Sequence, residues 1–124
     1  MTKFRLENSL FLNEAIVYIC SKFKIMLIHH VLFWLKADTS EETKKDFRSG
    51  LETLKDIESI QSIYIGTPAP IDRPVVDISY TFSLLIVFND LSGHDTYQVH
   101  PLHQAFLDSF RSLFEKVVIY DSVG

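Results

Sequence analysis

The stretch from Leu27 to Lys36 limits the possible folds more than any other part of the chain. Successive side chains of a β-strand point to opposite faces of the sheet. Here Val31 and Phe33 would lie on one face and Leu32 and Trp34 on the other, so both faces are apolar. This pattern is typical of a strand that is covered on both sides. The sheet that contains it therefore needs a packing layer on each face.

The next segment is predicted to be an amphipathic helix. Thr39 followed by Glu42 matches a capping box, in which two side chains bond free backbone N–H groups at a helix start. Apolar residues then recur at helical spacing with charged residues between them, as expected of a helix with one face on the core. The residues at this spacing are Phe47, Leu51, Leu54 and then Ile57 or Glu58.

Two further strands are predicted in the middle of the chain. Residues Ser59 to Thr67 alternate loosely, with Ile63 on one face and Ile60 on the other, and glycine and proline residues stop the strand. A polar loop follows. Residues Tyr80 to Phe88 are rich in aromatic and branched side chains and alternate more regularly, which predicts a third strand.

The C-terminal part is predicted to hold two helical pieces and a last strand. A short helical piece runs from Leu91 to about Val99, and Pro101 opens a longer one, because a proline at the first helical position loses no hydrogen bond. Residues Lys116 to Tyr120 form the last strand. The apolar stripe of the longer helix is predicted to be Phe106, Phe110, Leu113 and Phe114.

The element order is therefore β-α-β-β-α-β, the ferredoxin-like arrangement of the α+β class, with both helices on one face of a four-stranded antiparallel sheet. The second face of this sheet is apolar too, and 10 phenylalanines supply more ring area than one small core covers. The simplest solution is a homodimer in which two sheets close face to face into a barrel.

The first 25 residues differ from the rest of the chain. They hold four basic and two acidic residues, whereas the whole chain has a net charge of −4. Asn13 and Glu14 interrupt the apolar run from Leu10 to Cys20, which argues against a signal peptide, and the run is too short to span a bilayer. It could form an amphipathic helix. We favour a poorly ordered extension, with Met26 as the start of a single domain over residues 26–124.

Composition excludes several classes of function. A mildly acidic chain without a lysine or arginine run does not have the charge pattern of a nucleic-acid-binding or anionic-membrane-binding protein. One cysteine cannot form an internal disulfide or a thiolate zinc cluster. We therefore expect a cytoplasmic protein with no nucleic-acid or membrane partner.

The five histidines are the main chemical signal. They cluster in two places, with His29 and His30 on the first strand and His94, His100 and His103 around the joint between the last two helical pieces. Strand alternation sends His29 and His30 to opposite faces. At most one of them can therefore share a pocket with the second group.

One pair in the second group could carry acid–base chemistry. If Pro101 is the first helical residue, His103 lies in the first turn, where the helix dipole disfavours the imidazolium form and leaves the neutral form that a general base needs. Tyr97 could hold a substrate oxygen. His100 would occupy the cap position and have a structural role. The alternative is that all these residues only cap and pack, and spacing by itself favours that alternative.

A metal site is a weaker alternative. His100 and His103 are one helical turn apart, and His94 or Asp95 could complete a ligand set. Such spacing recurs often by chance, and a histidine at the cap would not share the direction of His103. From the sequence we assign neither a metal nor a cofactor.

Four segments resemble the stress-responsive dimeric α/β-barrel family, called Dabb. They are the strand opening at His29–Phe33, the strand end at Phe88–Asp90, the Tyr-x-x-His-Pro-x-His segment Tyr97–His103, and the closing Val117–Asp121. The Tyr97–His103 segment is the most specific of them. The resemblance covers roughly Met26 to Ser122, and it implies a ferredoxin-like protomer that pairs into a barrel.

The resemblance also implies candidate site residues. One plant member of the family is a polyketide cyclase, in which the tyrosine and the second histidine of this segment carry an intramolecular aldol condensation. They match Tyr97 and His103, and the strand-one histidine matches His29. The chain departs from that cyclase at Phe82, which stands where the cyclase has a further histidine and implies a less polar pocket. Trp34 stands where many relatives have a basic residue.

Four functions follow as hypotheses. The favoured one is a stress-related dimeric barrel, with the histidines serving structure and a small apolar ligand as a possible guest. The second is an acid–base enzyme of polyketide-cyclase type with His103 as base, Tyr97 as oxygen-binding partner and His29 as pocket member. The third is a transport or sensor module for hydrophobic ligands. The fourth is a small monooxygenase-like enzyme, suggested by analogy of fold alone.

Overall fold

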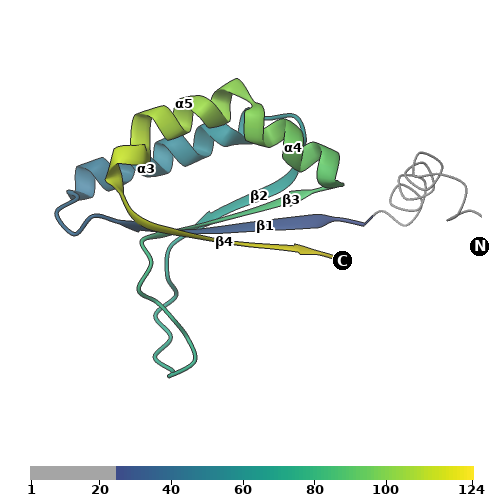
Figure 1. Cartoon of the computed structure of the whole chain (residues 1–124). Coiled ribbons are helices and arrows are strands. Elements are labelled where there is room, and N and C mark those ends of the chain that lie inside the picture. The colour runs from purple at the N-terminus through teal and green to yellow at the C-terminus, as the bar shows by residue number, and fades with distance from the viewer. Residues whose placement is uncertain (1–24) are drawn as a thin grey trace, which may run out of the picture.

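Four strands form one antiparallel sheet in the computed structural model of the chain, which describes residues 25–124 (Figure 1). The sheet order is β2-β3-β1-β4, and three α-helices lie over one of its faces. The strands are β1 (Leu27–Leu35), β2 (Ile60–Gly66), β3 (Phe82–Phe88) and β4 (Phe114–Val123). The helices are α3 (Glu41–Thr53), α4 (Leu91–Val99) and α5 (Pro101–Phe110), with short 3₁₀ turns η1 (Leu54–Asp56) and η2 (Arg111–Leu113).

This order confirms the predicted ferredoxin-like arrangement. The alternation in β1 is confirmed as well, because every second residue from Leu27 to Leu35 is buried and the others are half-buried. The predicted extension lies outside the described residues, apart from Ile25. No helix within residues 25–124 is long and apolar enough to cross a membrane.

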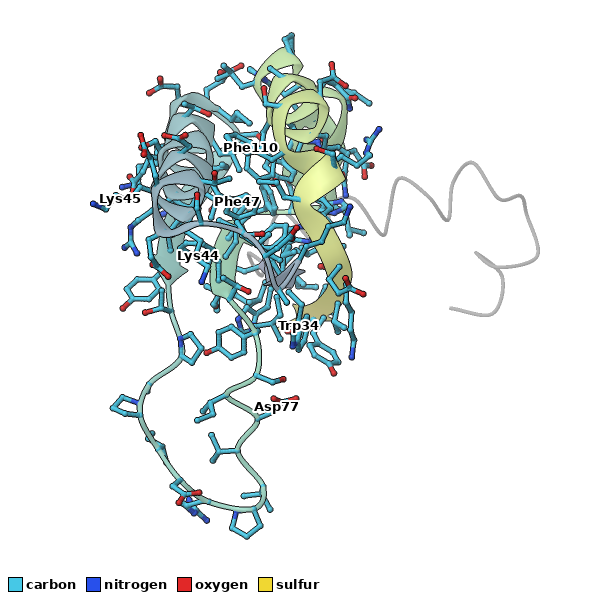
Figure 2. All side chains as sticks on the ribbon, turned by 90° about the vertical axis from the view of Figure 1, so that its left-hand side faces the viewer. Trp34, Lys44, Lys45, Phe47, Asp77 and Phe110 are labelled. Atoms are coloured by element: carbon cyan, nitrogen blue, oxygen red, sulfur yellow. The ribbon has the colours of Figure 1, made fainter. Side chains whose placement is uncertain are left out.

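The core is built around one aromatic side chain of α3. Phe47 is fully buried, and its ring stacks on that of Phe82 with 5.2 Å between the centroids. It also meets the rings of Phe33 and Phe110 edge-on at 5.2 and 5.4 Å. Figure 2 shows Phe47 and Phe110 between α3 and α5. Gly50 allows this packing, because an added Cβ would lie 2.3 Å from the Phe110 ring.

The helical stripe predicted near the C-terminus needs a correction. Only Phe106 is buried, whereas Phe110, Leu113 and Phe114 are half-buried at the margin of the core. Phe114 is the first residue of β4, not a helical residue, and β4 continues to Val123. The predicted strand was too short because pairing with β1 holds this segment extended beyond its apolar residues.

A β-bulge in β2 corrects the predicted faces of that strand. Ile60 pairs with Phe88 and Ser62 with Val87, so the register shifts by one residue at Gln61. The extra residue interrupts the alternation, as bulges do. Ile60 therefore packs on the core together with Ile63, whereas simple alternation placed them on opposite faces.

The start of α3 differs from the predicted capping box. Ser40 is the N-cap, and its hydroxyl accepts a hydrogen bond from the Thr43 backbone N–H at 3.1 Å. The Thr39 hydroxyl instead donates to the Lys36 carbonyl in the preceding turn. The tight turn after β1 moves the helix start one residue along the chain.

Ser40→Ala should lower the free energy of unfolding by about 1 kcal/mol, because it leaves an N–H at the helix start without its partner. Thr39→Ala is the matched control and should cost less, since no helix N–H depends on that hydroxyl. Urea unfolding of both variants measures the difference. A larger loss of unfolding free energy for Thr39→Ala than for Ser40→Ala would show that Thr39 is the N-cap, as the sequence predicts.

The second face of the sheet carries apolar side chains with a few satisfied polar groups. Trp34 lies on the side of the sheet opposite Phe47 (Figure 2), and its indole N–H donates to the Ser79 hydroxyl at 2.9 Å. His30 and Ser83 are hydrogen-bonded on neighbouring strands at 2.9 Å. The Trp34 N–H and the His30 Nε2 therefore both have hydrogen-bond partners within the chain.

Candidate active site

The helical face of the sheet and helices α4 and α5 form the walls of a cavity of about 210 Å³. All three residues predicted as a site, His29, Tyr97 and His103, line it. The remaining lining is mostly apolar and comes from β1, β3, α5 and β4: Val31, Phe33, Leu84, Phe106, Leu107, Phe114, Val117 and Ile119, with Gln98 from α4.

Tyr97 lies near the C-terminal end of α4. Only 2% of its surface is exposed, and its ring lies 4.5 Å from that of His103 between centroids. Burial raises the pKa of the phenol far above its usual value. The side chain is therefore a neutral hydrogen-bond donor at the cavity wall.

His103 lies in the first turn of α5, as the position of Pro101 predicts. Its Nδ1 is 3.1 Å from the Gln98 carbonyl oxygen. A carbonyl only accepts, so Nδ1 carries the proton and Nε2 is left as an acceptor. Burial is the largest effect on the pKa of His103 and lowers it, although the Gln98 hydrogen bond opposes the shift. The imidazole is therefore neutral near pH 7.

His100 has the structural role predicted for it. It is the N-cap of α5, and its Nδ1 accepts a hydrogen bond from the Leu102 backbone N–H at 3.1 Å. This contact turns the ring toward its own helix and away from the cavity. The alternative metal site built on His100 and His103 is therefore not formed among the described residues.

His29 has a hydrogen-bond partner that sequence reasoning missed. Its strand partner in β4 is Asp121, and His29 Nδ1 lies 2.6 Å from the carboxylate oxygen. Burial lowers the pKa of His29, and the bond to Asp121 opposes this shift. Asp121 appeared in the sequence only as the end of an apolar strand. Nothing local signals its pairing, because 92 positions separate the two residues.

His94 is the second residue that the structure places beside His29. Its ring meets those of His29 and Phe88 edge-on, at 5.1 and 5.6 Å between centroids. The sequence placed it near the second histidine cluster, with His100 and His103 as possible co-ligands. The structure instead puts it beside His29 and Asp121, because that side of α4 faces the start of β1 and the end of β4.

Phe82 does not line the cavity, contrary to what the resemblance implies. It stacks on Phe47 under α3, on the side of β1 away from β4. Leu84 is the β3 residue in the cavity wall. The β3 part of the cavity wall is apolar as expected, but Leu84 forms it and Phe82 does not.

A second, wider cleft of about 460 Å³ lies beside α3, and Lys44, Lys45 and Arg48 are among its lining residues. It holds none of the residues predicted as a site.

Comparison with known proteins adds three relatives. Olivetolic acid cyclase from Cannabis sativa is 24% identical over 94 residues, which are 75% of this chain and 91% of that protein. A dimeric ferredoxin-like protein of unknown function from Thermobifida fusca superposes with a TM-score of 0.68 at 19% identity, covering 81% of this chain and 92% of that one.

The third relative is the hydroxynitrile lyase of Passiflora edulis. It superposes with a TM-score of 0.67 at 18% identity, covering 80% of this chain and 93% of that one. At this level of identity the two structures show a shared fold. The family described as the stress-responsive A/B barrel domain matches residues 27–123, which include every strand and helix of the ferredoxin-like unit described above. The chain therefore belongs to the Dabb family of stress-responsive dimeric α/β-barrel proteins.

Proposed function

We propose that this protein binds a small apolar carbonyl compound in the cavity and moves a proton at the carbon next to the carbonyl. One observation carries the proposal: the Tyr97 side chain and the neutral His103 imidazole line the same largely apolar cavity. A purely structural role for the pair does not require such a shared space. Two of the similar proteins, a cyclase and a lyase, bear the names of enzymes.

The groups have complementary roles in this reaction. Nε2 of His103 takes the proton from the carbon, and the C–H electron pair moves onto the carbonyl oxygen to give an enolate. The Tyr97 hydroxyl donates a hydrogen bond to that oxygen, where negative charge develops. His103 becomes an imidazolium and returns its proton when the enolate is protonated or adds to a second carbonyl.

The cavity limits the substrate. Its volume of about 210 Å³ is below the roughly 300 Å³ at which pockets for drug-sized ligands begin. Val117 and Ile119 of the edge strand are partly exposed, so the cavity has an open side. A compact diketone fits these limits better than a long polar molecule.

Exchange of acidic C–H protons tests the proposal. We expect the protein to accelerate deuterium uptake by a small 1,3-diketone in D₂O, followed by proton NMR, over buffer and over an equal concentration of free imidazole. Tyr97→Phe should slow the exchange, because it removes the donor to the enolate oxygen. Equal rates with and without protein, across a panel of such diketones, would contradict the proposal and leave a ligand-binding barrel.

The exchange rate should rise with pH and level off before neutrality. A base must be unprotonated, and burial holds the pKa of His103 below its usual 6.5. The cations facing it act in the same direction, namely Arg111 and the imidazolium forms of His29 and His94, and Tyr97 stays neutral. Rates from pH 4.5 to 8 measure the profile. A midpoint above 6.5 would exclude His103 as the base in this environment.

A homodimer that closes on the second sheet face is part of the proposal. Leu32, Leu85 and Val87 on the central strands are apolar and only half-buried within one chain. The Thermobifida fusca relative is dimeric. Covering this face would remove an apolar surface that soluble monomers seldom expose.

Light scattering should therefore give twice the 14.3 kDa mass of the chain. Leu85→Asp should shift the protein toward monomer, because it places a charge at the centre of the face. Ala105→Asp, on the exposed side of α5, is the matched control and should remain a dimer. A wild-type mass near 14.3 kDa would contradict the pairing.

A further inference from the structure

We infer that His29, His94 and Asp121 form a site for one divalent first-row transition-metal ion of the Zn²⁺ type. One ring nitrogen from each histidine and one carboxylate oxygen lie within 4.8 Å of one another. Two imidazoles and a carboxylate are a ligand set that suits zinc and related ions, and three protein ligands leave a position for water.

Three separate elements build the site. Strand pairing between β1 and β4 sets His29 directly beside Asp121, so both side chains stand on the helical face of the sheet. His94 comes from the first turns of α4 and lies against the His29 ring. The assembly therefore depends on the fold, and the unfolded chain has no equivalent cluster.

The three ligands differ in burial, and this difference leaves one side of the site open to solvent. The side chain of His29 is 4% exposed and that of His94 is 16% exposed, whereas that of Asp121 is 44% exposed. An ion can thus enter from the Asp121 side and be held by the buried His29 ring and the half-buried His94 ring. The first coordination shell would remain open to solvent at one position.

The ligands need only a small movement. His29 Nδ1 and the Asp121 oxygen are 2.6 Å apart, joined by a hydrogen bond. Tetrahedral ligands at the usual zinc distances stand about 3.3 Å apart. The ion would take the position between these two atoms, and His29 would bind it as the other neutral tautomer, with its proton on Nε2.

Gln98 lies next to His94, one helical turn along α4. Its amide nitrogen is 3.1 Å from His94 Nε2, and because an amide nitrogen only donates, Nε2 accepts this hydrogen bond. An ion bound by His94 would therefore either replace Gln98 at Nε2 or displace the proton of the other ring nitrogen. The proposed base His103 and Tyr97 are not ligands, so metal binding can be measured without following diketone exchange.

Metal titration of the full chain tests the inference. Calorimetry with Zn²⁺ should give one ion per chain, and Co²⁺ should give visible d–d bands without a thiolate charge-transfer band. His94→Ala should weaken binding by more than about 100-fold, since loss of an outer-shell partner alone costs 10–100-fold. Asp121→Asn should weaken it as well. The His100→Asn and Cys20→Ser variants are the controls and should bind like the wild type.

A second measurement covers the case in which a variant fails to fold. In the wild-type protein, Zn²⁺ should shift the imidazole ¹⁵N resonances of His29 and His94 and leave those of His100 unchanged. Three results would each overturn the inference: no binding at millimolar Zn²⁺, equal binding by folded His94→Ala, or shifts confined to other histidines.

Discussion

Phe47→Ala should lower the free energy of unfolding by about 3–5 kcal/mol, the usual cost of removing a buried phenylalanine ring. Phe47 has no exposed surface, and five other phenylalanine rings lie within 6.1 Å of its own between centroids. These partners come from both the sheet and α5, so they cannot all move into the space left by the ring. The loss would therefore include a cavity as well as the transfer of apolar surface.

Denaturant unfolding at one fixed protein concentration measures this loss, since the stability of a dimer depends on concentration. Lys45→Ala is the control. Lys45 lies two residues away on the same helix but points to solvent (Figure 2), and its replacement should change stability by less than about 0.5 kcal/mol. A cost below about 1 kcal/mol for Phe47→Ala would mean that α3 does not hold the core.

His103→Gln should reduce the diketone exchange rate by about 10²–10⁴-fold, the range that general-base catalysis contributes. Glutamine can keep the hydrogen bond to the Gln98 carbonyl but has no group that accepts a proton near neutral pH. We therefore expect the fold and ligand affinity to be retained. Exchange rates at saturating diketone, with the thermal midpoint as a check of folding, separate the loss of chemistry from a loss of binding.

His100→Asn is the matched control, because asparagine is also a good N-cap and preserves the start of α5. It should leave the exchange rate within about twofold of the wild type, since His100 does not line the cavity. An equal drop of the exchange rate in both variants would mean that a disturbed start of α5, and not the loss of the base, slows the exchange. An unchanged rate in His103→Gln would show that another group takes the proton.

The basicity of His103 shows how burial limits such a site. Burial and the neighbouring cations lower its pKa, which keeps the imidazole neutral but also makes it a weaker base. The low pKa suits a carbon acid that is already activated, as between two carbonyl groups. For this reason a diketone is a better probe than a simple ketone.

The neighbourhood of His103 was predictable from the sequence because it is local. Pro101 defines the helix start, so the cap at His100 and the first-turn position of His103 follow from a few adjacent residues. The same holds for the two-sided pattern of β1. In both cases the deciding interactions run between residues that are close in sequence.

Other positions depended on pairing between distant strands. The side to which Ile60 points is decided by a bulge against β3, which has no clear mark in the sequence of β2. Phe82 was expected in the cavity, but its place relative to β1 directs it under α3. Alternation within one strand tells which residues share a face, and not which helix covers them.

The sequence by itself therefore determined the order of strands and helices, the apolar second face and the Tyr97–His103 pair. The tertiary structure decided that this pair shares a cavity with His29, and that His29 meets Asp121 and His94. The physical reason is the range of the interactions. Caps and alternation are set within a few residues, whereas the His29–Asp121 contact exists only when β1 and β4 pair in one register.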